Sequence, residues 1–442
     1  MESASNSTCP LPDTAHSESV TPLGELGLHA PPSCLEFLQK SSWEQFFVVG
    51  TYQLEPDIFE KSEPVPNTDE NIASENPKEQ SRNGTLNLIR LDVNNGSIRK
   101  IHTVKCDSAI YDLHFLPGQQ FFAAASSTGT ISFYEVIETE RDLAEASSGI
   151  SPSLRMELLF TKQVFSPTTI ITYFTFFPLH ILNLYRPLIV ATTDDGGVYL
   201  MVCDMTAQKI ELLNDGEPVH RHVLKEGGAP DFAWCCAVNS NVTTSIYSGG
   251  DNAELVRIKL ENDTAGLCDL DEKVKTELYR HMFHDAGVTA ILPLPHCESD
   301  DSALLLTGSY DTHIRLYSIS HQRVMAQLDL GGGVYRLRLI QEHNLPAHAP
   351  RRFSYLILAC CMHGGTKVID VRTVSTDDYV MEVVGSLNVP ANDSGNYCYA
   401  GDVLPPPHTA KTHQQGLPLM RKRMFVSGSF VDRKLTSWLL DH

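Results

Sequence analysis

The stretch ALLLTGSYDTHIRLYSI, residues 303–319, decides the fold of this chain. Its apolar first half closes on Gly308-Ser309, a tight turn follows, and polar and apolar residues then alternate from Thr312 to Tyr317. Alternation with a period of two is typical of a β-strand with one buried face, so the stretch predicts two strands joined by a turn. Helical periodicity is sustained nowhere in the chain.

The same unit recurs along the chain. Each copy has a short apolar strand, a loop, an apolar run that closes on Gly or Ser, a tight turn and an alternating strand. In the six other copies, the apolar run, the turn and the alternating strand are FFVVGTYQL (46–54) with TLNLIRLDV (85–93), FFAAASSTGTISFYEV (121–136), PLIVATTDDGGVYLMVCD (187–204), TSIYSGGDNAELVRIKL (244–260), YLILACCMHGGTKVID (355–370) and MFVSGSFVDRKLTSWLL (424–440). Seven such units form a closed ring, in which radial repetition leaves only short, protected strand edges. The sequence therefore predicts an all-β, seven-bladed β-propeller with long loop insertions.

The fifth unit is the best match to a WD40 repeat. Residues 284–288, His-Asp-Ala-Gly-Val, resemble the Gly-His entry of such a repeat, and residues 304–319 resemble its closing half. Tyr317-Ser318 stands in place of the Trp-Asp pair that names the family. We therefore expect a propeller of the WD40 type.

Two segments outside the repeats lack the apolar residues that a core needs. Residues 1–32 are dominated by Ser, Pro and Thr and have no basic start followed by an apolar run, so we expect a disordered N-terminal tail and no signal peptide. Residues 55–84 contain eight acidic and three basic residues, and we expect a disordered acidic insertion. The propeller should span residues 33–442, and neither segment should be needed for folding.

The charge of the chain limits its partners. With 34 Lys and Arg against 54 Asp and Glu, the formal net charge is −20. Such a field repels nucleic acid phosphates and anionic lipid surfaces, so neither nucleic acid nor membrane is expected as a partner. Residues 164–185 contain no charged side chain, but Pro167, Pro178 and many β-branched and aromatic residues favour a buried strand over a membrane span.

The cysteines favour the cytosol. The chain has 11 of them, none forms a C-x-x-C pair, and most lie in apolar runs, where a free thiol behaves as a small buried hydrophobic group. We therefore expect a cytoplasmic protein. We also expect the chain to be a monomer.

Seven short motifs point to one family. In chain order they are GTYQL (50–54), SGGD (248–251), TGSYD (307–311), GGVYR (332–336), ACCMHGG (359–365), YAGD (399–402) and SGSFVD (427–432). Together they resemble the diphthine methylesterase family, a WD40 family of diphthamide biosynthesis, over roughly residues 34–440. The chain departs from the family at Tyr335, where Trp is expected, and at SGSFVD, which is one residue longer.

The resemblance implies an enzyme. Members of this family are expected to be carboxylic ester hydrolases that remove the methyl ester from methylated diphthine on translation elongation factor 2, which would be the partner, with no cofactor. Such an enzyme needs a base or nucleophile, donors for the oxyanion, and a site for the trimethylammonium group beside the ester. Without the resemblance the sequence favours a non-catalytic WD40 scaffold for protein–protein interaction, because G-x-S-x-G and H-E-x-x-H are both missing.

His363 is the first catalytic candidate. Blades four and five have Asp251 and Asp311 at the turn after the second strand, where an acid is typically a structural cap, and blade six has His363 in that slot. A histidine suits a base near neutral pH, and Gly364-Gly365 leaves room for a substrate; a solvated turn histidine is the structural alternative. Cys361 would share a face with His363 in a continued strand and could act as nucleophile, although packing is the more common role. A water activated by histidine is the preferred mechanism.

The innermost strands supply the other candidates. Asp112, Arg336 and Asp402 lie there, where unpaired charges are costly. Either they form ion pairs between blades, or Arg336 binds a carboxylate or oxyanion and Asp112 or Asp402 binds the trimethylammonium; Asp402 is also a catalytic candidate. Tyr335 and Trp234, with Tyr310 and Phe430, would add aromatic faces for the cation. Convergence of His363, Arg336 and an acid in one pocket would favour an enzyme, and separated, self-paired side chains a scaffold.

No metal is expected. His220-x-His222 and His281-x-x-His284 have spacings that occur in metal sites, but no Cys or carboxylate completes a set nearby in the sequence.

Overall fold

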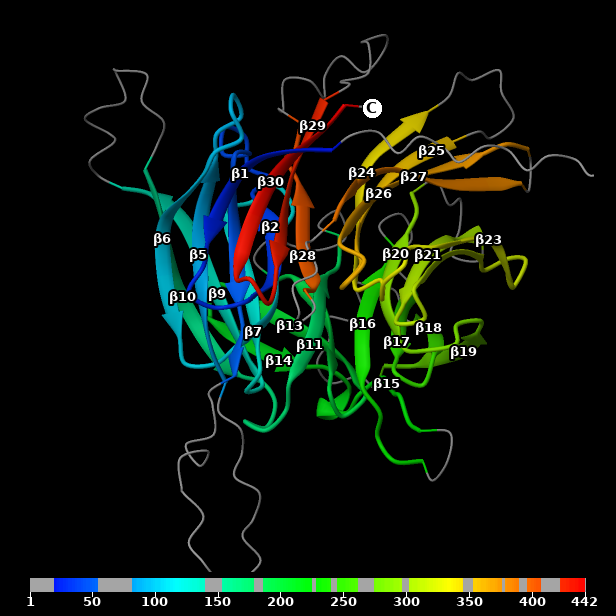
Figure 1. The fold of residues 1–442 in the computed structure, drawn as a ribbon. Coiled ribbons are helices and arrows are strands. Elements are labelled where there is room, and N and C mark those ends of the chain that lie inside the picture. Colours follow the sequence, from blue (N-terminus) through cyan, green and yellow to red (C-terminus); the bar gives the residue numbers. More distant parts are fainter. Residues whose placement is uncertain are drawn as a thin grey trace, which may run out of the picture.

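The structure is a computed structural model, and it describes residues 20–54, 82–139, 153–178, 186–224, 228–239, 245–260, 274–295, 302–344, 353–375, 378–388, 396–406 and 422–441. Within these ranges the chain forms seven antiparallel sheets of four or five strands, the blades of a propeller (Figure 1). Each innermost strand contacts the innermost strands of the two neighbouring blades, and the last blade contacts the first, so the ring is closed. The prediction of an all-β, seven-bladed propeller is confirmed.

The first three blades are built from the following strands, innermost strand first. Blade one contains β2 (Pro32–Phe37), β3 (Phe46–Thr51), β5 (Arg82–Leu91) and β6 (Ile98–Cys106), with the short β4 (Gln53–Leu54). Blade two contains β7 (Ile110–Phe115), β8 (Phe121–Ser126), β9 (Thr130–Glu138) and β10 (Leu154–Gln163). Blade three contains β11 (Ile171–Phe176), β12 (Leu188–Thr193), β13 (Gly197–Asp204), β14 (Lys209–Leu212) and β15 (His220–Arg221).

The other four blades follow the same order. Blade four contains β16 (Ala233–Val238), β17 (Ser245–Gly250), β18 (Glu254–Leu260) and β19 (Thr276–Met282), and blade five contains β20 (Val288–Pro293), β21 (Leu304–Ser309), β22 (His313–Ser318) and β23 (Arg323–Asp329). Blade six contains β24 (Arg336–Asn344), β25 (Phe353–Cys360), β26 (Thr366–Thr373) and β27 (Tyr379–Leu387). Blade seven contains β28 (Cys398–Val403), β29 (Lys422–Ser429), β30 (Lys434–Asp441) and β1 (Thr21–Gly27).

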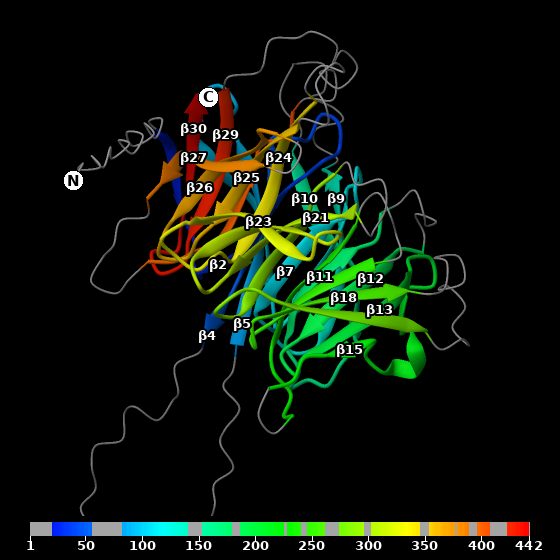
Figure 2. The same ribbon diagram turned by 90° about the vertical axis from the view of Figure 1, so that its right-hand side faces the viewer.

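Blade seven is completed by the start of the chain. Strand β1 pairs with β30 along its length, from Thr21 opposite Leu439 to Gly27 opposite Lys434 (Figure 1). Figure 2 shows the blue start of the chain near the red C-terminal strands. The expectation of a disordered tail is therefore wrong for residues 20–32, while residues 1–19 lie outside the described residues. Strand β1 is mostly exposed, and backbone pairing with β30 holds it in place. A strand without a buried face has no alternating apolar pattern, so the sequence does not predict it.

Truncation tests this closure. Removing residues 1–27 is expected to lower the stability of the chain by about 2–4 kcal/mol, because β30 would become an unpaired edge and the ring would lose its link between the two ends of the chain. The measurement is urea denaturation of the full chain and of chains starting after residue 19 and after residue 27. Equal midpoints for the last two would show that β1 does not hold the ring closed.

The acidic insertion is shorter than expected. Residues 82–84 belong to β5, so the expectation of a disordered segment is wrong for them, and residues 55–81 lie outside the described residues. Strand β11 confirms the buried strand that the sequence predicts within residues 164–185. Among the described residues, no helix is long and apolar enough to cross a bilayer.

A repeated bulge shapes the channel. In six innermost strands one extra residue interrupts the pairing with the second strand: Ser33, Tyr111, Thr172, Trp234, Thr289 and Tyr399. The three hydroxyl side chains Ser33, Thr172 and Thr289 donate hydrogen bonds to backbone carbonyls of the next blade, at Ile110, Ala233 and Val334. A bulge changes the direction in which its side chain points. The hydroxyl side chains therefore link neighbouring blades, and the aromatic side chains lie at one mouth of the channel.

Candidate functional site in the central channel

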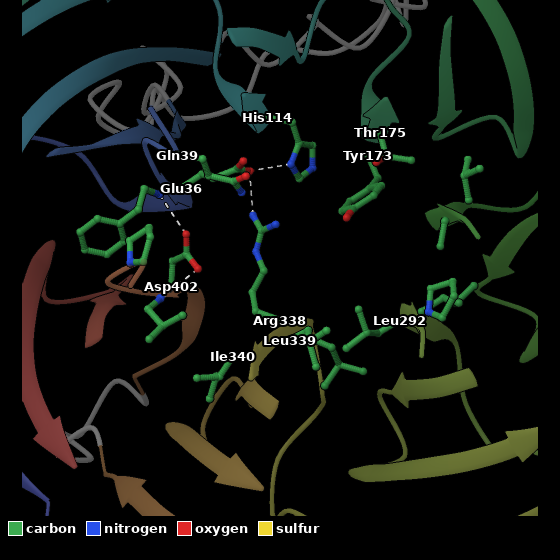
Figure 3. Close-up of a pocket in the computed structure, with 18 of the residues that line it drawn as sticks. Glu36, Gln39, His114, Tyr173, Thr175, Leu292, Arg338, Leu339, Ile340 and Asp402 are labelled. Atoms are coloured by element: carbon green, nitrogen blue, oxygen red, sulfur yellow. Dashed lines mark hydrogen bonds and ion pairs between the residues drawn. The ribbon is translucent and has the colours of Figure 1, made fainter. Parts of the chain in front are cut away.

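The channel holds a cavity of about 450 Å³ where the innermost strands end. All seven innermost strands contribute to its wall. The polar lining side chains include Glu36, His114, Tyr173, Arg338 and Asp402, and Figure 3 shows them around one opening. Val238, Leu292 and Ile340 are among the apolar lining residues. A concave site with a few polar groups on an apolar wall is typical of small-ligand recognition.

Glu36 is the centre of the charged wall. Its Oε2 lies 2.7 Å from Nδ1 of His114 and 3.0 Å from Nη2 of Arg338, and Oε1 accepts a hydrogen bond from the backbone N–H of Phe115 (Figure 3). Burial acts to raise the pKa of Glu36, but Arg338 and His114 outweigh it and hold the pKa below its ordinary value. Glu36 is therefore an ionised, fully engaged carboxylate.

His114 lies between two carboxylates. Its Nε2 is 3.1 Å from Oδ2 of Asp112, without the alignment of a hydrogen bond, and its Nδ1 faces Glu36. Burial acts to lower the pKa of His114, but Asp112 and Glu36 outweigh it and hold the pKa above its ordinary value. The imidazole therefore favours the protonated form and adds a buried positive charge.

Asp112 and Arg336 form an ion pair across the channel. Nη2 of Arg336 lies 2.9 Å from Oδ1 of Asp112, and Oδ2 of Asp112 accepts a hydrogen bond from the backbone N–H of Phe174. The Arg336 guanidinium also lies over the ring of Tyr173, 4.5 Å from its centroid. The pair therefore links blades two, three and six.

Asp402 differs from Glu36 and Asp112 because no cation among the described residues is bonded to it. Its Oδ2 accepts a hydrogen bond from the backbone N–H of Phe37 at 2.9 Å, and Oδ1 accepts one from Val403 at 2.9 Å. Burial raises the pKa of Asp402 to about 6, against the lowering effect of Arg338 and with a further increase from Glu36. Asp402 is therefore a lining group that can exchange a proton near neutral pH.

An aromatic cluster surrounds the opposite mouth of the channel. We call it the aromatic rim; it contains Tyr52, Tyr111, Phe232, Trp234, Tyr310, Tyr335, Tyr397, Tyr399 and Phe430, whose rings contact one another in pairs. Trp234 donates its indole N–H to Asp251 at 2.7 Å, and Tyr335 packs against Tyr399 with ring centroids 4.8 Å apart. Trp234 and Tyr335 thus lie at the start of the innermost strands, not among the residues lining the cavity.

His363 and Cys361 do not share a face. Strand β25 ends at Cys360, and Met362, between the two residues, has a φ of 46°, so the strand does not continue to His363. Cys361 is fully buried in the core, while His363 is exposed. Burial raises the pKa of the Cys361 thiol, which is the wrong direction for a nucleophile. His363 lies just beyond the end of β25, where Cys360 pairs with Arg336 at the start of β24. The cavity lies further along β24, towards Ile340. His363, Arg336 and an acid therefore do not converge in the cavity.

Asp251 and Asp311, which the sequence suggests are equivalent turn residues, occupy different positions in their turns. The last paired residues before the turn are Gly249 and Leu255 in strands β17 and β18, and Gly308 and Ile314 in strands β21 and β22. Asn252, not Asp251, therefore occupies the place of Asp311. The slot of His363 does match that of Asp311, because Cys360 pairs with Thr366.

The sequence indicates part of the charged channel wall. It predicts the charged residues Asp402, Asp112 and Arg336 on innermost strands, but not His114 and Arg338, which lie two residues beyond Asp112 and Arg336. The signal was present, because residues two apart on a strand face the same side. Glu36 carried the same signal in the first innermost strand.

Comparison with known proteins agrees with the fold. The model of the "WD domain, G-beta repeat" matches residues 274–318. One solved structure, "Crystal Structure of Mitotic Checkpoint Complex", contains a chain with a TM-score of 0.52 and 11% sequence identity, covering 98% of this chain and 100% of that one. This likeness concerns the fold alone.

Curated relatives extend over most of the chain. The mouse protein named diphthine methyltransferase is 23% identical over 383 residues, 85% of this chain and 69% of its own length. The human protein of the same name is 25% identical and covers 77% of this chain and 66% of its own length. The protein of that name in Saccharomyces cerevisiae is 20% identical, over 93% of this chain and 96% of its own. The chain is thus a seven-bladed β-propeller with a WD40 repeat, related at low identity to proteins named diphthine methyltransferase.

Proposed function

We propose that the chain is a carboxylic ester hydrolase that removes the methyl ester from methylated diphthine on translation elongation factor 2, with the channel cavity as its active site. The observation that carries the proposal is Asp402, a buried acid that lines the cavity together with Arg338 and has a pKa raised to about 6. A base with this pKa is ionised at neutral pH and still accepts a proton effectively. The similarity to proteins named diphthine methyltransferase supports the substrate class.

The lining residues suit ester hydrolysis by an activated water. Asp402 takes a proton from a water molecule as the water oxygen attacks the ester carbonyl, and the Arg338 guanidinium stabilises the developing oxyanion. Collapse of the intermediate breaks the bond to the methoxy group, which leaves as methanol with the proton returned from Asp402. The products are diphthine with a free carboxylate, methanol and one released proton.

The trimethylammonium group has no N–H to donate, so its site must attract it through negative charge or aromatic faces. Tyr173 lines the same cavity and supplies an aromatic face for this cation, while Glu36 is already bound to His114 and Arg338. Asp112 and Arg336, which are bound to each other, hold the wall in place in this scheme. The aromatic rim, with Trp234 and Tyr335, is the competing cation site at the opposite mouth, and Trp234→Ala distinguishes the two: an unchanged KM supports the cavity.

Mass spectrometry of elongation factor 2 tests the reaction. Incubation of the methyl-esterified factor with the purified chain is expected to remove the mass of one methylene group and release methanol, with no added cofactor. His363→Ala, the alternative base, is expected to keep this activity because the side chain is exposed and outside the cavity. A mass gain that depends on a methyl donor would replace hydrolysis with methyl transfer, and loss of activity in His363→Ala would move the base to that turn.

A non-catalytic scaffold is the second candidate. It is favoured by the self-paired charges of the channel, in which Arg336 is bound to Asp112 and Arg338 to Glu36. Under this function the chain would bind elongation factor 2 equally well with and without the methyl ester and change the mass of neither form.

A further inference from the structure

Three buried ligand groups meet between blades three and four. His220 lies in β15 of blade three, His222 follows β15 in the segment that leads to blade four, and Glu254 opens β18 of blade four. All three residues are buried, and one ligand atom from each lies within 4.8 Å of the others. The sequence alone predicts no metal site, because Glu254 lies far from the two histidines in the chain and only the fold brings it close to them.

Blade five shows what His222 lacks. There His284 occupies the same place, with Nε2 2.8 Å from Thr307 Oγ1 and Nδ1 3.0 Å from Asp311 Oδ2. In blade four, Nε2 of His222 lies 2.9 Å from Ser248 Oγ, but Asn252 replaces the aspartate and donates its amide to the carbonyl of Val223. Within the described part of the chain, Nδ1 of His222 is therefore buried without a hydrogen-bond partner, as is Nε2 of His220.

The hydrogen bonds assign the tautomer of His222. The Ser248 hydroxyl donates to the carbonyl of Cys235, so it accepts from His222, which must carry its proton on Nε2. The lone pair of Nδ1 then points towards Oε2 of Glu254, 3.7 Å away. The Nδ1 lone pair of His222 and the Glu254 carboxylate therefore face each other, with His220 beside them.

Arg280 is the cation that Glu254 contacts in this structure. Its Nη1 lies 2.9 Å and 3.2 Å from the two carboxylate oxygens. The Arg280 side chain is 52% exposed, so it can turn towards solvent, and among the described residues it leaves both histidine nitrogens without a partner.

We propose that His220, His222 and Glu254 bind a divalent transition metal ion of the Zn²⁺ type. Two imidazole nitrogens and one carboxylate oxygen match the ligands that Zn²⁺ takes, with bonds of about 2.0–2.2 Å and a fourth position for water. Small side-chain rotations bring the three atoms to that range. The bound ion would fasten the connection between blades three and four to β18 and would stabilise the propeller away from the channel.

Zinc titration of the full chain tests the proposal. Chelator-treated protein is titrated with ZnCl₂ in a calorimeter, with MgCl₂ as the comparison ion and His102→Gln in blade one as the matched histidine control. Wild type and the control are expected to bind about one Zn²⁺ with a Kd near or below about 1 μM, and Mg²⁺ is expected not to bind. His220→Gln and Glu254→Gln should weaken Zn²⁺ binding by about 10- to 100-fold or more and abolish the rise in melting temperature on adding Zn²⁺.

Arg280→Ala gives a test that folding defects cannot imitate. Removing this exposed cation frees Glu254, so Zn²⁺ is expected to bind roughly three- to ten-fold more tightly. Tighter binding in Arg280→Ala with weaker binding in Glu254→Gln supports the site. Absence of Zn²⁺ binding by wild type, or equal affinity in His220→Gln, Glu254→Gln and wild type, overturns it.

Discussion

Replacing Asp402 with asparagine is expected to lower the rate of ester hydrolysis by about 10²- to 10⁴-fold, which is the contribution typical of a general base. The introduced amide would keep the volume of the side chain and one carbonyl acceptor, but it cannot take a proton from water. The change also removes a buried carboxylate, so the chain should remain folded. The measurement is turnover of methyl-esterified elongation factor 2, with the thermal melt of each variant as the folding control.

The pH dependence follows from the direction of the Asp402 shift. The pKa in the folded chain is about 6, above the ordinary value of 3.8, so the folded state holds this proton to higher pH than the unfolded state does. The stability that this group contributes is therefore present below about pH 4 and is lost as the pH rises through about 6. Turnover needs the ionised form, so kcat/KM should rise as the pH passes through about 6.

His363→Ala is the matched comparison for this experiment. We expect it to keep both the turnover and the ascending limb of the pH profile, because the exposed turn side chain does not line the cavity. Full activity in Asp402→Asn, or an ascending limb that stays near pH 6 in that variant, would rule out Asp402 as the base.

Replacing Arg336 with methionine is expected to cause the largest loss of stability, about 3–5 kcal/mol, because it removes the ion-pair partner of the buried Asp112 carboxylate and leaves His114 as its only remaining ion-pair partner among the described residues. Burial acts to raise the pKa of Asp112, and Arg336 and His114 now outweigh it and hold the pKa below 3.8. The stability from this group is therefore present above about pH 4 and is lost as the pH falls below it. Urea denaturation at pH 7 measures the loss.

A double variant separates pairing from substrate binding. Arg336→Met with Asp112→Leu removes both charges, so much of the lost stability should return. If Arg336 instead binds the substrate, the single variant will keep its stability and raise KM. A single variant as stable as wild type would therefore contradict the role of this pair in joining the blades.

The sequence by itself determined the repeated part of the fold. Alternation with a period of two and a turn after each apolar run are local properties, and residues 303–319 show both, so seven hairpins and a propeller could be predicted without any contact between distant residues. The same alternation placed Asp112, Arg336 and Asp402 on innermost strands. Applied two residues further, it would also have found His114 and Arg338.

Only the tertiary structure decided which of these groups meet. Closure of the ring pairs β1 with β30 and sets Glu36 beside Arg338, because strand pairing and blade order join segments from opposite ends of the chain. The backbone at Met362 separates Cys361 from His363, which spacing alone could not show. Burial likewise decides chemistry at the equivalent acids Glu36 and Asp402. Burial acts to raise both pKa values, but Arg338 and His114 are bonded to Glu36 and hold its pKa below the ordinary value. Asp402 has no bonded cation among the described residues, so burial raises its pKa to about 6.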